Sequence, residues 1–520
     1  MAPAEPSATL VPVQPTATLA LPPTPLAGQV ALWVDPRLPA ALQENLVLLP
    51  EVVLVDQPEK AALRLEPGDQ QPVSRWVYAL AAAFATELQG VTSDDLKNAW
   101  RGKPGGSLAG QPLLIDESTQ AIFTALWGAP AAGAVNVLSP PAMLDYAWGH
   151  HPAIAILPFE SLEPRWKVLE VDGQSPLRKE FDPAKYALSV PVSLDGPDVT
   201  TRQVIAAQIP PSNRDPHKLT VVAMTGVTAL VRATAFTMEQ RGILYPGRDV
   251  RDWLRDADLV HVSNEVPFAK DCPFPNPVQP DMRFCSDPRY IQLLEDVGTN
   301  IVELTGDHFQ DWGANAMLYT LDLYRQRGWQ YYGGGANLAE GRKALLVENN
   351  GNRLAFIGCN GKGGSYAQAS ATHPGAAVCD YAWMAKEVAR LRKAGYLPIV
   401  TFQYFEYYSY KAQPNQERDF RLMADAGAVI VSGSQAHQPQ AMEFRNGAFI
   451  HYGLGNLFFD QYDVSQACRQ GFIDRHVFYD GRYIGTELLP ILFVDYARPR
   501  PMTPGEQDDL LRTVFRASGW

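Results

Sequence analysis

A chain of 520 residues is too long for a single hydrophobic core, because cores stop growing near ~250–300 residues, so we expect two domains. With 46% hydrophobic and 19% charged residues, the composition is that of a folded globular protein. The net charge of -12 disfavours nucleic acid as a partner, since the phosphate backbone would repel it. No run of ~18 uncharged apolar residues occurs, which argues against a membrane-spanning helix.

Residues 1–27 are rich in proline, alanine and threonine and carry almost no charge. They lack the basic start and the unbroken apolar run of a signal peptide, and their composition is typical of a flexible tether. Such tethers commonly follow the lipidated cysteine of bacterial surface lipoproteins. We therefore expect an extracytoplasmic protein, at the cell surface or secreted, whose only membrane association would come from a lipid anchor absent from this sequence.

Residues 28–210 are predicted to form an α/β domain, because short apolar strands, such as 29–35 and 52–56, alternate with helix patterns. A helix is expected after the candidate N-cap residues Thr92 and Ser93. This helix, with a later strand followed by a Pro-Phe pair, resembles segments of periplasmic phosphate-type solute-binding proteins. An α/β module of unrelated origin is the other open interpretation, and the pattern indicates no ligand.

A polar, proline-containing linker is predicted over residues 211–217, followed by a second domain over 218–495. The helix patterns of this domain end in glycine, and each is followed by a strand within a few residues. This alternation is typical of an α/β fold with a largely buried sheet. Residues 496–520 are predicted to form a C-terminal tail with a short helix.

The five cysteines all lie in the second half of the chain, and none forms the C-x-x-C pair of a zinc ribbon. Cys272 and Cys285 flank a proline-rich loop, and Cys359 and Cys379 flank a glycine-rich one. Each pair could close a disulfide, which would agree with an extracytoplasmic location, and buried free thiols are the open alternative. Cys468 is then left over.

Polar residues of the second domain gather where its strands are predicted to end, which is the usual place for sites in α/β folds. They fall in the segments 263–265, 306–311, 403–408 and 432–437. Glycine-rich stretches at 333–335 and 360–364 do not fit a phosphate-binding loop, and we interpret them as turns between elements.

The order and spacing of these segments resemble the CapA family, which is named for a capsular poly-γ-glutamate synthesis protein and is part of the metallophosphoesterase-like superfamily. The closing motif of the family is nearly intact at Tyr452-Gly453-Leu454-Gly455-Asn456. Over residues 216–495 the resemblance implies a calcineurin-like α/β/β/α sandwich. It also implies a site of the kind in which two cations clamp an anionic centre.

Other residues occupy three of the metal-binding positions that the family would lead us to expect. Val227 stands in place of the first Asp, Phe402 or Gln403 in place of one His, and Ser434 in place of another. Because a valine cannot bridge two metal ions, we do not expect a two-metal centre.

The polar residues that remain are expected to build the site. Catalytic roles are predicted for Glu265, Asp307, His308, Glu406 and His437. Asp307, His308 and His437, with one of Glu265 or Glu406, would hold one divalent metal ion, either Mn, Zn or Mg. Residues predicted to contact the substrate are Asn264, Asp311, Gln403, Tyr404, Tyr407, Gln435 and Asn456. Metal-free acid–base catalysis and a relic in which these groups only hydrogen-bond one another are the open alternatives.

Residues 402–410 contain six aromatic side chains, which could line a groove for a sugar or peptide polymer or belong to the core. The resemblance implies a protein that acts in synthesis, processing or anchoring of a surface polymer, either an anionic polypeptide such as poly-γ-glutamate or an envelope glycan. If active, it would be a hydrolase. The alternative is a non-catalytic binding module that has lost the metal centre. The sequence gives no indication of oligomeric state.

Overall fold

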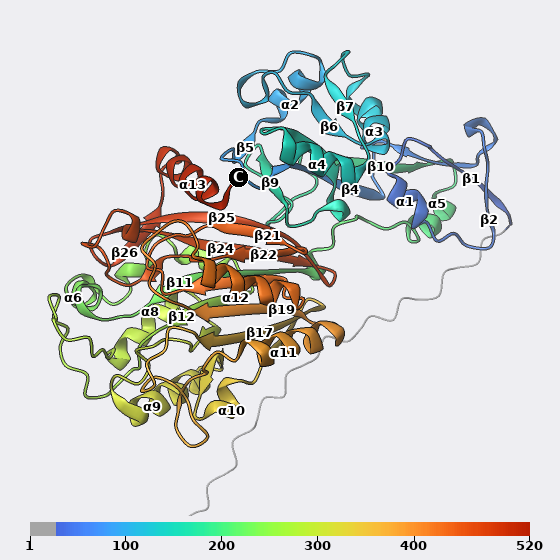
Figure 1. Cartoon of the computed structure of the whole chain (residues 1–520). Coiled ribbons are helices and arrows are strands. Elements are labelled where there is room, and N and C mark those ends of the chain that lie inside the picture. Colours follow the sequence, from blue (N-terminus) through green and yellow to red (C-terminus); the bar gives the residue numbers. More distant parts are fainter. Residues whose placement is uncertain (1–27) are drawn as a thin grey trace, which may run out of the picture. The chain divides into compact units, whose positions relative to one another are not determined.

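Figure 1 shows the computed structural model of the chain, which describes residues 28–520, so the predicted tether lies outside the described residues. The chain divides into two compact units, and each is discontinuous in sequence. Unit 1 comprises residues 28–74 and 191–211, and unit 2 comprises 75–190 and 212–520. Among the described residues, no helix is long and apolar enough to cross a membrane.

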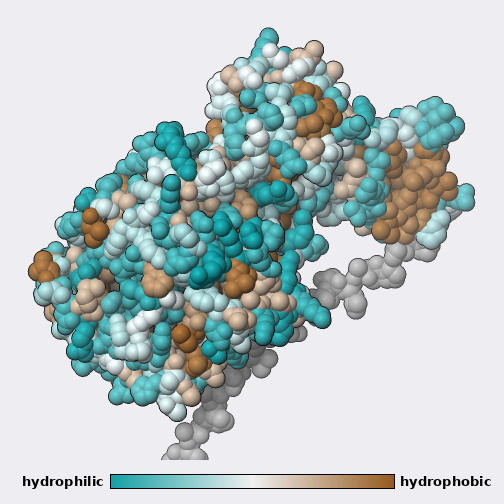
Figure 2. Space-filling view, viewed as in Figure 1, coloured by the Kyte–Doolittle hydropathy of each residue, from teal (hydrophilic) through white to brown (hydrophobic). Residues whose placement is uncertain are grey.

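Unit 1 is a small α/β unit. Its elements are β1 (Val30–Val34), α1 (Ala40–Glu44), β2 (Val52–Leu54), β3 (Leu63–Pro67), β10 (Ser189–Asp195) and α5 (Val199–Ala206). Strand β1 pairs in parallel with β2 and β3, and β10 pairs antiparallel with β3. Apolar side chains gather on the surface of this unit (Figure 2), where Val47, Val53 and Leu54 are exposed.

The N-terminal part of unit 2 is a second α/β layer. It contains β4 (Ser74–Ala83), β5 (Gly90–Val91), α2 (Ser93–Trp100), β6 (Leu113–Ile115), α3 (Glu117–Trp127), β7 (Val135–Val137), α4 (Pro140–Gly149), β8 (Ile154–Pro158) and β9 (Trp166–Val171). Strand β4 is antiparallel to β8 and β9, and β6 is parallel to β7. The helix predicted after Thr92 is present as α2, and Thr92 and Asp95 form its capping box.

Two sheets form the centre of the C-terminal domain. The first contains β11 (Leu219–Thr228), β12 (Leu259–Asn264), β13 (Ile301–Glu303), β14 (Gln330–Tyr332), β23 (Asn456–Phe458), β24 (Gln470–Tyr479), β25 (Arg482–Val494) and β26 (Arg498–Pro501). The second contains β16 (Leu345–Asn349), β17 (Asn352–Asn360), β19 (Leu397–Gln403), β20 (Ile430–Ser434), β21 (Met442–Arg445) and β22 (Ala448–His451). The runs β11 to β14 and β17-β19-β20-β22 are parallel.

Shorter elements and helices complete the domain. They are α6 (Arg232–Arg241), α7 (Arg251–Arg255), α8 (Ile291–Asp296), α9 (Gly313–Gln326), β15 (Gly334–Gly335), α10 (Leu338–Gly341), β18 (Gly375–Ala376), α11 (Tyr381–Lys393), α12 (Pro414–Asp425) and α13 (Pro504–Ser518). Short 3-10 helices lie at Pro58–Lys60, Gly106–Leu108, Phe159–Ser161, Pro216–Lys218, Tyr245–Gly247, Pro288–Tyr290 and Ala467–Arg469.

The two sheets pack face to face, because apolar side chains of both, such as Met224 of β11 and Ile399 of β19, share one buried core. The other face of the second sheet packs against α11 and α12, where Val388 and Phe420 are buried. Helices α6, α8 and α9 lie outside the first sheet (Figure 1). The predicted fold class, an α/β/β/α sandwich preceded by an α/β domain, is thus confirmed.

One aromatic cluster joins the N-terminal part of unit 2 to the sandwich. Phe84, which follows β4, is buried and lies 5.1 Å from Phe444, 5.2 Å from Phe449 and 6.0 Å from Trp520, measured between ring centroids. Phe515 of α13 belongs to the same core. The C-terminal helix therefore contributes to the packing of this unit.

In the structure, disulfides join Cys272 to Cys285 and Cys359 to Cys379, with Cα–Cα distances of 5.7 and 5.0 Å. Both fall within the usual range for the bond. Cys468 is a buried free thiol.

Candidate metal centre

The carboxyl ends of parallel strands from both sheets bring the predicted site residues together. Glu265 follows β12 and Asp307 follows β13 in the first sheet, while Gln403 ends β19 in the second. Gln403 Nε2 donates to Glu265 Oε1 at 3.0 Å and to Asp307 Oδ1 at 3.1 Å. The amide therefore connects the two carboxyl groups across the sandwich.

The two buried carboxyl groups have opposite ionisation states. Burial raises the pKa of Glu265 to about 8, and the negative charge of Asp307 adds to this shift. Burial also opposes ionisation of Asp307, but a hydrogen bond from Glu265 and the charges of His308 and Lys362 lower its pKa to about 2. At neutral pH, Glu265 is thus protonated and Asp307 is ionised, the pairing that acid–base chemistry uses.

This assignment predicts how Glu265→Gln changes stability in protein kept free of cations with a chelator. Because the folded pKa is raised, the contribution of Glu265 to stability is fully present below its ordinary value of 4.5 and is lost as pH rises through about 8. The variant does not titrate, so its free energy of unfolding, measured in denaturant, should rise relative to the unmodified protein between these pH values.

A matched control is Glu348→Gln, at an exposed position on β16. Its stability relative to the unmodified protein should not change over the same pH interval. If the free energy of unfolding of Glu265→Gln had the same pH dependence as that of the unmodified protein, this result would contradict the raised pKa of Glu265.

His308 is held in place by a carboxylate. Its Nδ1 lies 2.6 Å from Asp311 Oδ2, and the same oxygen accepts a hydrogen bond from the Phe284 backbone N–H at 2.9 Å. Burial lowers the pKa of His308, but Asp311, Glu265 and Asp307 outweigh this effect and raise it to about 9. A carboxylate on Nδ1 leaves Nε2 free for a ligand, as in many metal-binding histidines.

Glu265, Asp307 and His308 form a cluster that could hold a metal ion, since one ligand atom from each lies within 4.8 Å of the others. Two carboxylate oxygens and an imidazole nitrogen suit Mn, Zn or Mg to different degrees. In the absence of a cation, both Glu265 and the His308 ring keep a proton at neutral pH, and a divalent ion would displace both protons. The chemistry of the donor set therefore fits one divalent cation.

His437 lies in a neighbouring group. Its Nδ1 is 2.9 Å from Asn456 Oδ1 and its Nε2 is 4.0 Å from Glu406 Oε1. Burial lowers the pKa of His437 to about 4, so the ring is neutral at neutral pH. The predicted ligands Asp307 and His308 thus belong to the three-residue cluster, and His437 to a group formed with Glu406 and Asn456.

The positions where this chain departs from the family do not fit a second metal ion of the family type. Val227 is fully buried in an apolar cluster with Val266, Phe284 and Phe459. Ser434 Oγ donates to Gln403 Oε1 at 2.7 Å. A valine supplies no ligand atom, and the Gln403 amide N–H groups are donors directed at the carboxylates.

Lys362 belongs to the site but was not among the predicted site residues, and it lies in the glycine-rich segment interpreted as a turn. Its Nζ is 2.8 Å from Asp307 Oδ2 and 2.5 Å from Glu406 Oε1. Burial opposes the charge on Lys362, but both carboxylates raise its pKa above the ordinary value. Asn360, the last residue of β17, pairs in register with Gln403 of β19, and this pairing brings Lys362 to the same edge as Gln403.

The other predicted contact residues have varied surroundings. Gln435 donates to Glu406 at 3.0 Å and also hydrogen-bonds Gln403, whereas Asn264 donates to Val266 O and Tyr324 Oη. In the aromatic run, Phe402 and Tyr404 are buried in the core, Tyr407 is half-buried, and Phe405 and Tyr408 are exposed. The exposed members are the ones that a ligand in solution could contact.

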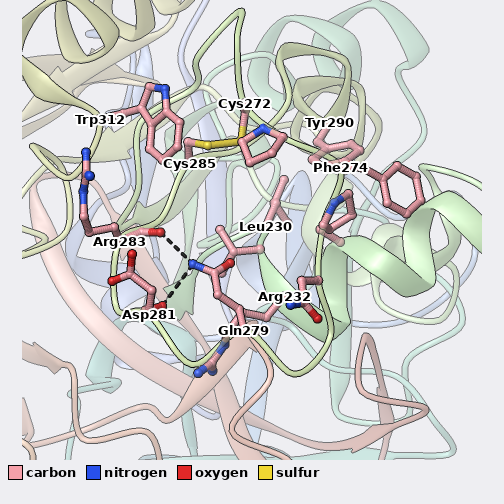
Figure 3. A pocket seen from close by; sticks show the side chains of 15 residues that line it. Leu230, Arg232, Cys272, Phe274, Gln279, Asp281, Arg283, Cys285, Tyr290 and Trp312 are labelled. Atoms are coloured by element: carbon pink, nitrogen blue, oxygen red, sulfur yellow. Dashed lines mark hydrogen bonds between the residues drawn. A yellow bond between two sulfur atoms is a disulfide. The ribbon is translucent and has the colours of Figure 1, made fainter.

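A pocket of about 360 Å³ is lined by the loop that the Cys272–Cys285 disulfide closes (Figure 3). Arg283 donates from Nε and Nη2 to the Asp311 carbonyl oxygen at 3.3 and 3.2 Å. Its guanidinium also lies 5.5 Å from the centroid of the Trp312 ring. The wall of the pocket thus contacts the residue that positions His308.

Residues 221–461 match the family model described as Bacterial capsule synthesis protein PGA_cap. The chain is 25% identical over 304 residues to the Capsule biosynthesis protein CapA of Bacillus anthracis, covering 57% of this chain and 72% of that protein. It is 26% identical over 172 residues to the PGA biosynthesis protein CapA of Bacillus subtilis (strain 168), covering 33% and 45%. The match thus spans less than half of the second relative.

Two solved structures show weak likeness. The NAD nucleotidase of Haemophilus influenzae is 8% identical with a TM-score of 0.33, covering 58% of this chain and 56% of that one. An ABC-type phosphate transport receptor from Vibrio cholerae is 16% identical with a TM-score of 0.27, covering 35% and 93%. The family match confirms, over residues 221–461, the predicted resemblance of the C-terminal domain to the CapA family of capsule synthesis proteins.

Proposed function

We propose that this chain is a cell-envelope protein that acts in the synthesis or processing of an anionic surface polymer of the poly-γ-glutamate type. The names of the matched relatives, which refer to capsule and PGA biosynthesis, support the polymer. In this proposal the chain cleaves or transfers the polymer at a centre with one divalent cation. The observation that carries it is the cluster of Glu265, Asp307 and His308, with His308 fixed by Asp311.

In the proposed site, Glu265, Asp307 and His308 would hold the cation. A divalent ion there would polarise a carbonyl group and lower the pKa of a bound water. Gln403 keeps the carboxyl groups of Glu265 and Asp307 in a fixed relation, which preorganises the ligands. Glu406, whose side chain is 34% exposed, lies at the edge of the site and can accept a hydrogen bond from a polymer amide.

A non-catalytic binding module is the second candidate. It is favoured by the apolar packing of Val227 and by the internal neutralisation of Asp307 and Glu406 by Lys362. In this case the site would recognise the polymer without cleaving it, and the exposed rings of Phe405 and Tyr408 would supply contact area.

The test is to load the protein separately with Mn, Zn and Mg, remove free metal, and determine bound metal by elemental analysis. Each sample is then incubated with poly-γ-glutamate of defined length, an envelope glycan, and a chromogenic phosphoester. We expect one ion per chain and metal-dependent shortening of the poly-γ-glutamate, with little phosphoester cleavage. Absence of both bound metal and turnover would contradict the proposed enzymatic function. Polymer binding without cleavage would support the non-catalytic binding module.

A further inference from the structure

Trp312 lines two cavities of the C-terminal domain. The first, of about 360 Å³, is the pocket of Figure 3, and Arg283 is part of its wall. The second, of about 390 Å³, is lined by the segment 269–271 and by residues of α9. Because the two cavities share the indole of Trp312, they adjoin at this ring. Together they form a groove, which we call the Trp312 groove.

Each cavity of the Trp312 groove contains a cationic side chain above an aromatic ring. Lys270 Nζ lies 4.9 Å from the centroid of the Tyr319 ring, and the Arg283 guanidinium carbon lies 5.5 Å from that of the Trp312 ring. Lys270 and Arg283 are exposed, and neither forms an ion pair with a carboxylate of residues 28–520. Each cavity therefore offers one positive charge to an anionic group from solution.

The groove is held in shape by hydrogen bonds and packing. Arg283 uses Nε and Nη2 to donate to the Asp311 carbonyl oxygen, which leaves Nη1 for a ligand. Trp312 Nε1 donates to Asp271 Oδ1 at 3.0 Å, so this carboxylate of the second cavity already has a partner. The indole also packs against Cys285 of the disulfide. Side chains fixed in this way lose little conformational entropy when a ligand binds.

The groove favours a ligand that carries carboxylates at intervals along a chain. Each cavity has one unpaired cation and one aromatic face, so a single small anion would occupy only one of them. Guanidinium and ammonium groups bind carboxylates through charge-assisted hydrogen bonds, and aromatic faces contact the apolar parts of a backbone. A polymer with one carboxylate per repeat unit matches both features, whereas a neutral glycan would leave both cations unpaired.

We propose that the Trp312 groove binds the anionic surface polymer, with one carboxylate at Arg283 and another at Lys270. This inference rests on the proposed function for the identity of the polymer, poly-γ-glutamate, and adds a binding surface outside the metal cluster. One segment connects the two. Arg283 contacts the main chain of Asp311, and the ring of the next residue, Phe284, lies 4.8 Å from that of His308.

One acid in the groove opposes the ligand. Asp281 lines the first cavity and is exposed, and its carboxylate forms no ion pair in the part of the chain that the structure describes. Its charge would repel a polymer carboxylate held at Arg283, so Asp281→Asn should strengthen polymer binding. Structural damage weakens binding, and a gain in affinity therefore separates an effect of charge from one of misfolding.

The experiment measures binding of poly-γ-glutamate of defined length to the full chain by calorimetry, in the presence of a chelator, so that neither bound metal nor turnover contributes. Lys270→Gln and Arg283→Gln should each weaken binding about 5-fold, as expected for exposed ion pairs, and the double variant should bind more weakly than either. Lys386→Gln and Arg248→Gln replace exposed cations outside the groove. These matched controls should bind as the unmodified protein does.

The same polymer with its carboxylates amidated should not bind. Unmodified affinity in the double variant, or an equal loss in the two control variants, would overturn the groove and leave the proposed function standing. A chain that binds a neutral glycan but not poly-γ-glutamate, or that binds neither, would also overturn the inference. The proposed cleavage is judged separately, by the assay on metal-loaded protein.

Discussion

His308→Ala is expected to abolish stoichiometric metal binding and, with it, any metal-dependent cleavage of the polymer. The cluster has a single imidazole ligand, and its remaining ligands are two carboxyl groups of which one is protonated at neutral pH. Replacing an outer partner of a metal ligand typically costs ~10–100-fold in affinity, so removal of the ligand itself should cost more. Titration of chelator-treated protein with Zn or Mn, followed by calorimetry, measures this loss.

Asp311→Asn provides a graded companion to this variant. It keeps the shape of the side chain but weakens the hold on His308 Nδ1, so we expect a fall in metal affinity of ~10–100-fold. His373→Ala removes an exposed histidine and should leave affinity unchanged. An unaltered metal content in His308→Ala would show that the three-residue cluster is not the binding site. It would favour the interpretation that these groups only hydrogen-bond one another.

The sequence could predict the site residues that stand at strand ends, since strand order alone places them on one edge. Glu265 and Asp307 follow recognisable buried strands, and the structure joins them through Gln403. The sequence alone could not show which histidine lies next to Glu265 and Asp307. His308 and His437 both lie at suitable edges. Only the side-chain geometry shows that His308 belongs to the cluster and that His437 lies near Glu406.

Lys362 could not be assigned from residue type, because lysines in glycine-rich loops are usually solvated. Its role comes from two ion pairs with residues distant in sequence. The division into two units could not be predicted for a similar reason, because it depends on contacts between residues that are distant in sequence. Residues 191–211 return to the unit that contains 28–74, and an antiparallel pairing such as β10 with β3 leaves no local pattern in the chain.

Phe84→Ala is expected to be strongly destabilising although Phe84 lies outside the site. The ring is 1% exposed and packs edge-on against Phe444, with Phe449 and Trp520 also in contact range. Truncation of a buried phenylalanine costs ~3–5 kcal/mol, because the transfer free energy of the ring is lost and a cavity remains. Denaturant unfolding of the full chain measures this change, and Phe274→Ala is its control. Phe274 is 67% exposed, so its truncation should stay within ~0.5 kcal/mol.

The same variant tests whether residues 75–190 and the sandwich fold together. Phe84 follows β4, whereas its partners belong to β21, β22 and the end of the chain. If this cluster couples the two parts, its loss should let α2, α3 and α4 exchange amide hydrogens at a lower free energy than the sandwich strands. Equal protection of both parts in Phe84→Ala, or a Phe84 effect no larger than that of Phe274, would mean that other contacts hold the unit together. The coupling matters for the site, because the same core contains Met224 of β11 and Ile399 of β19, strands of the two sheets that meet at the site.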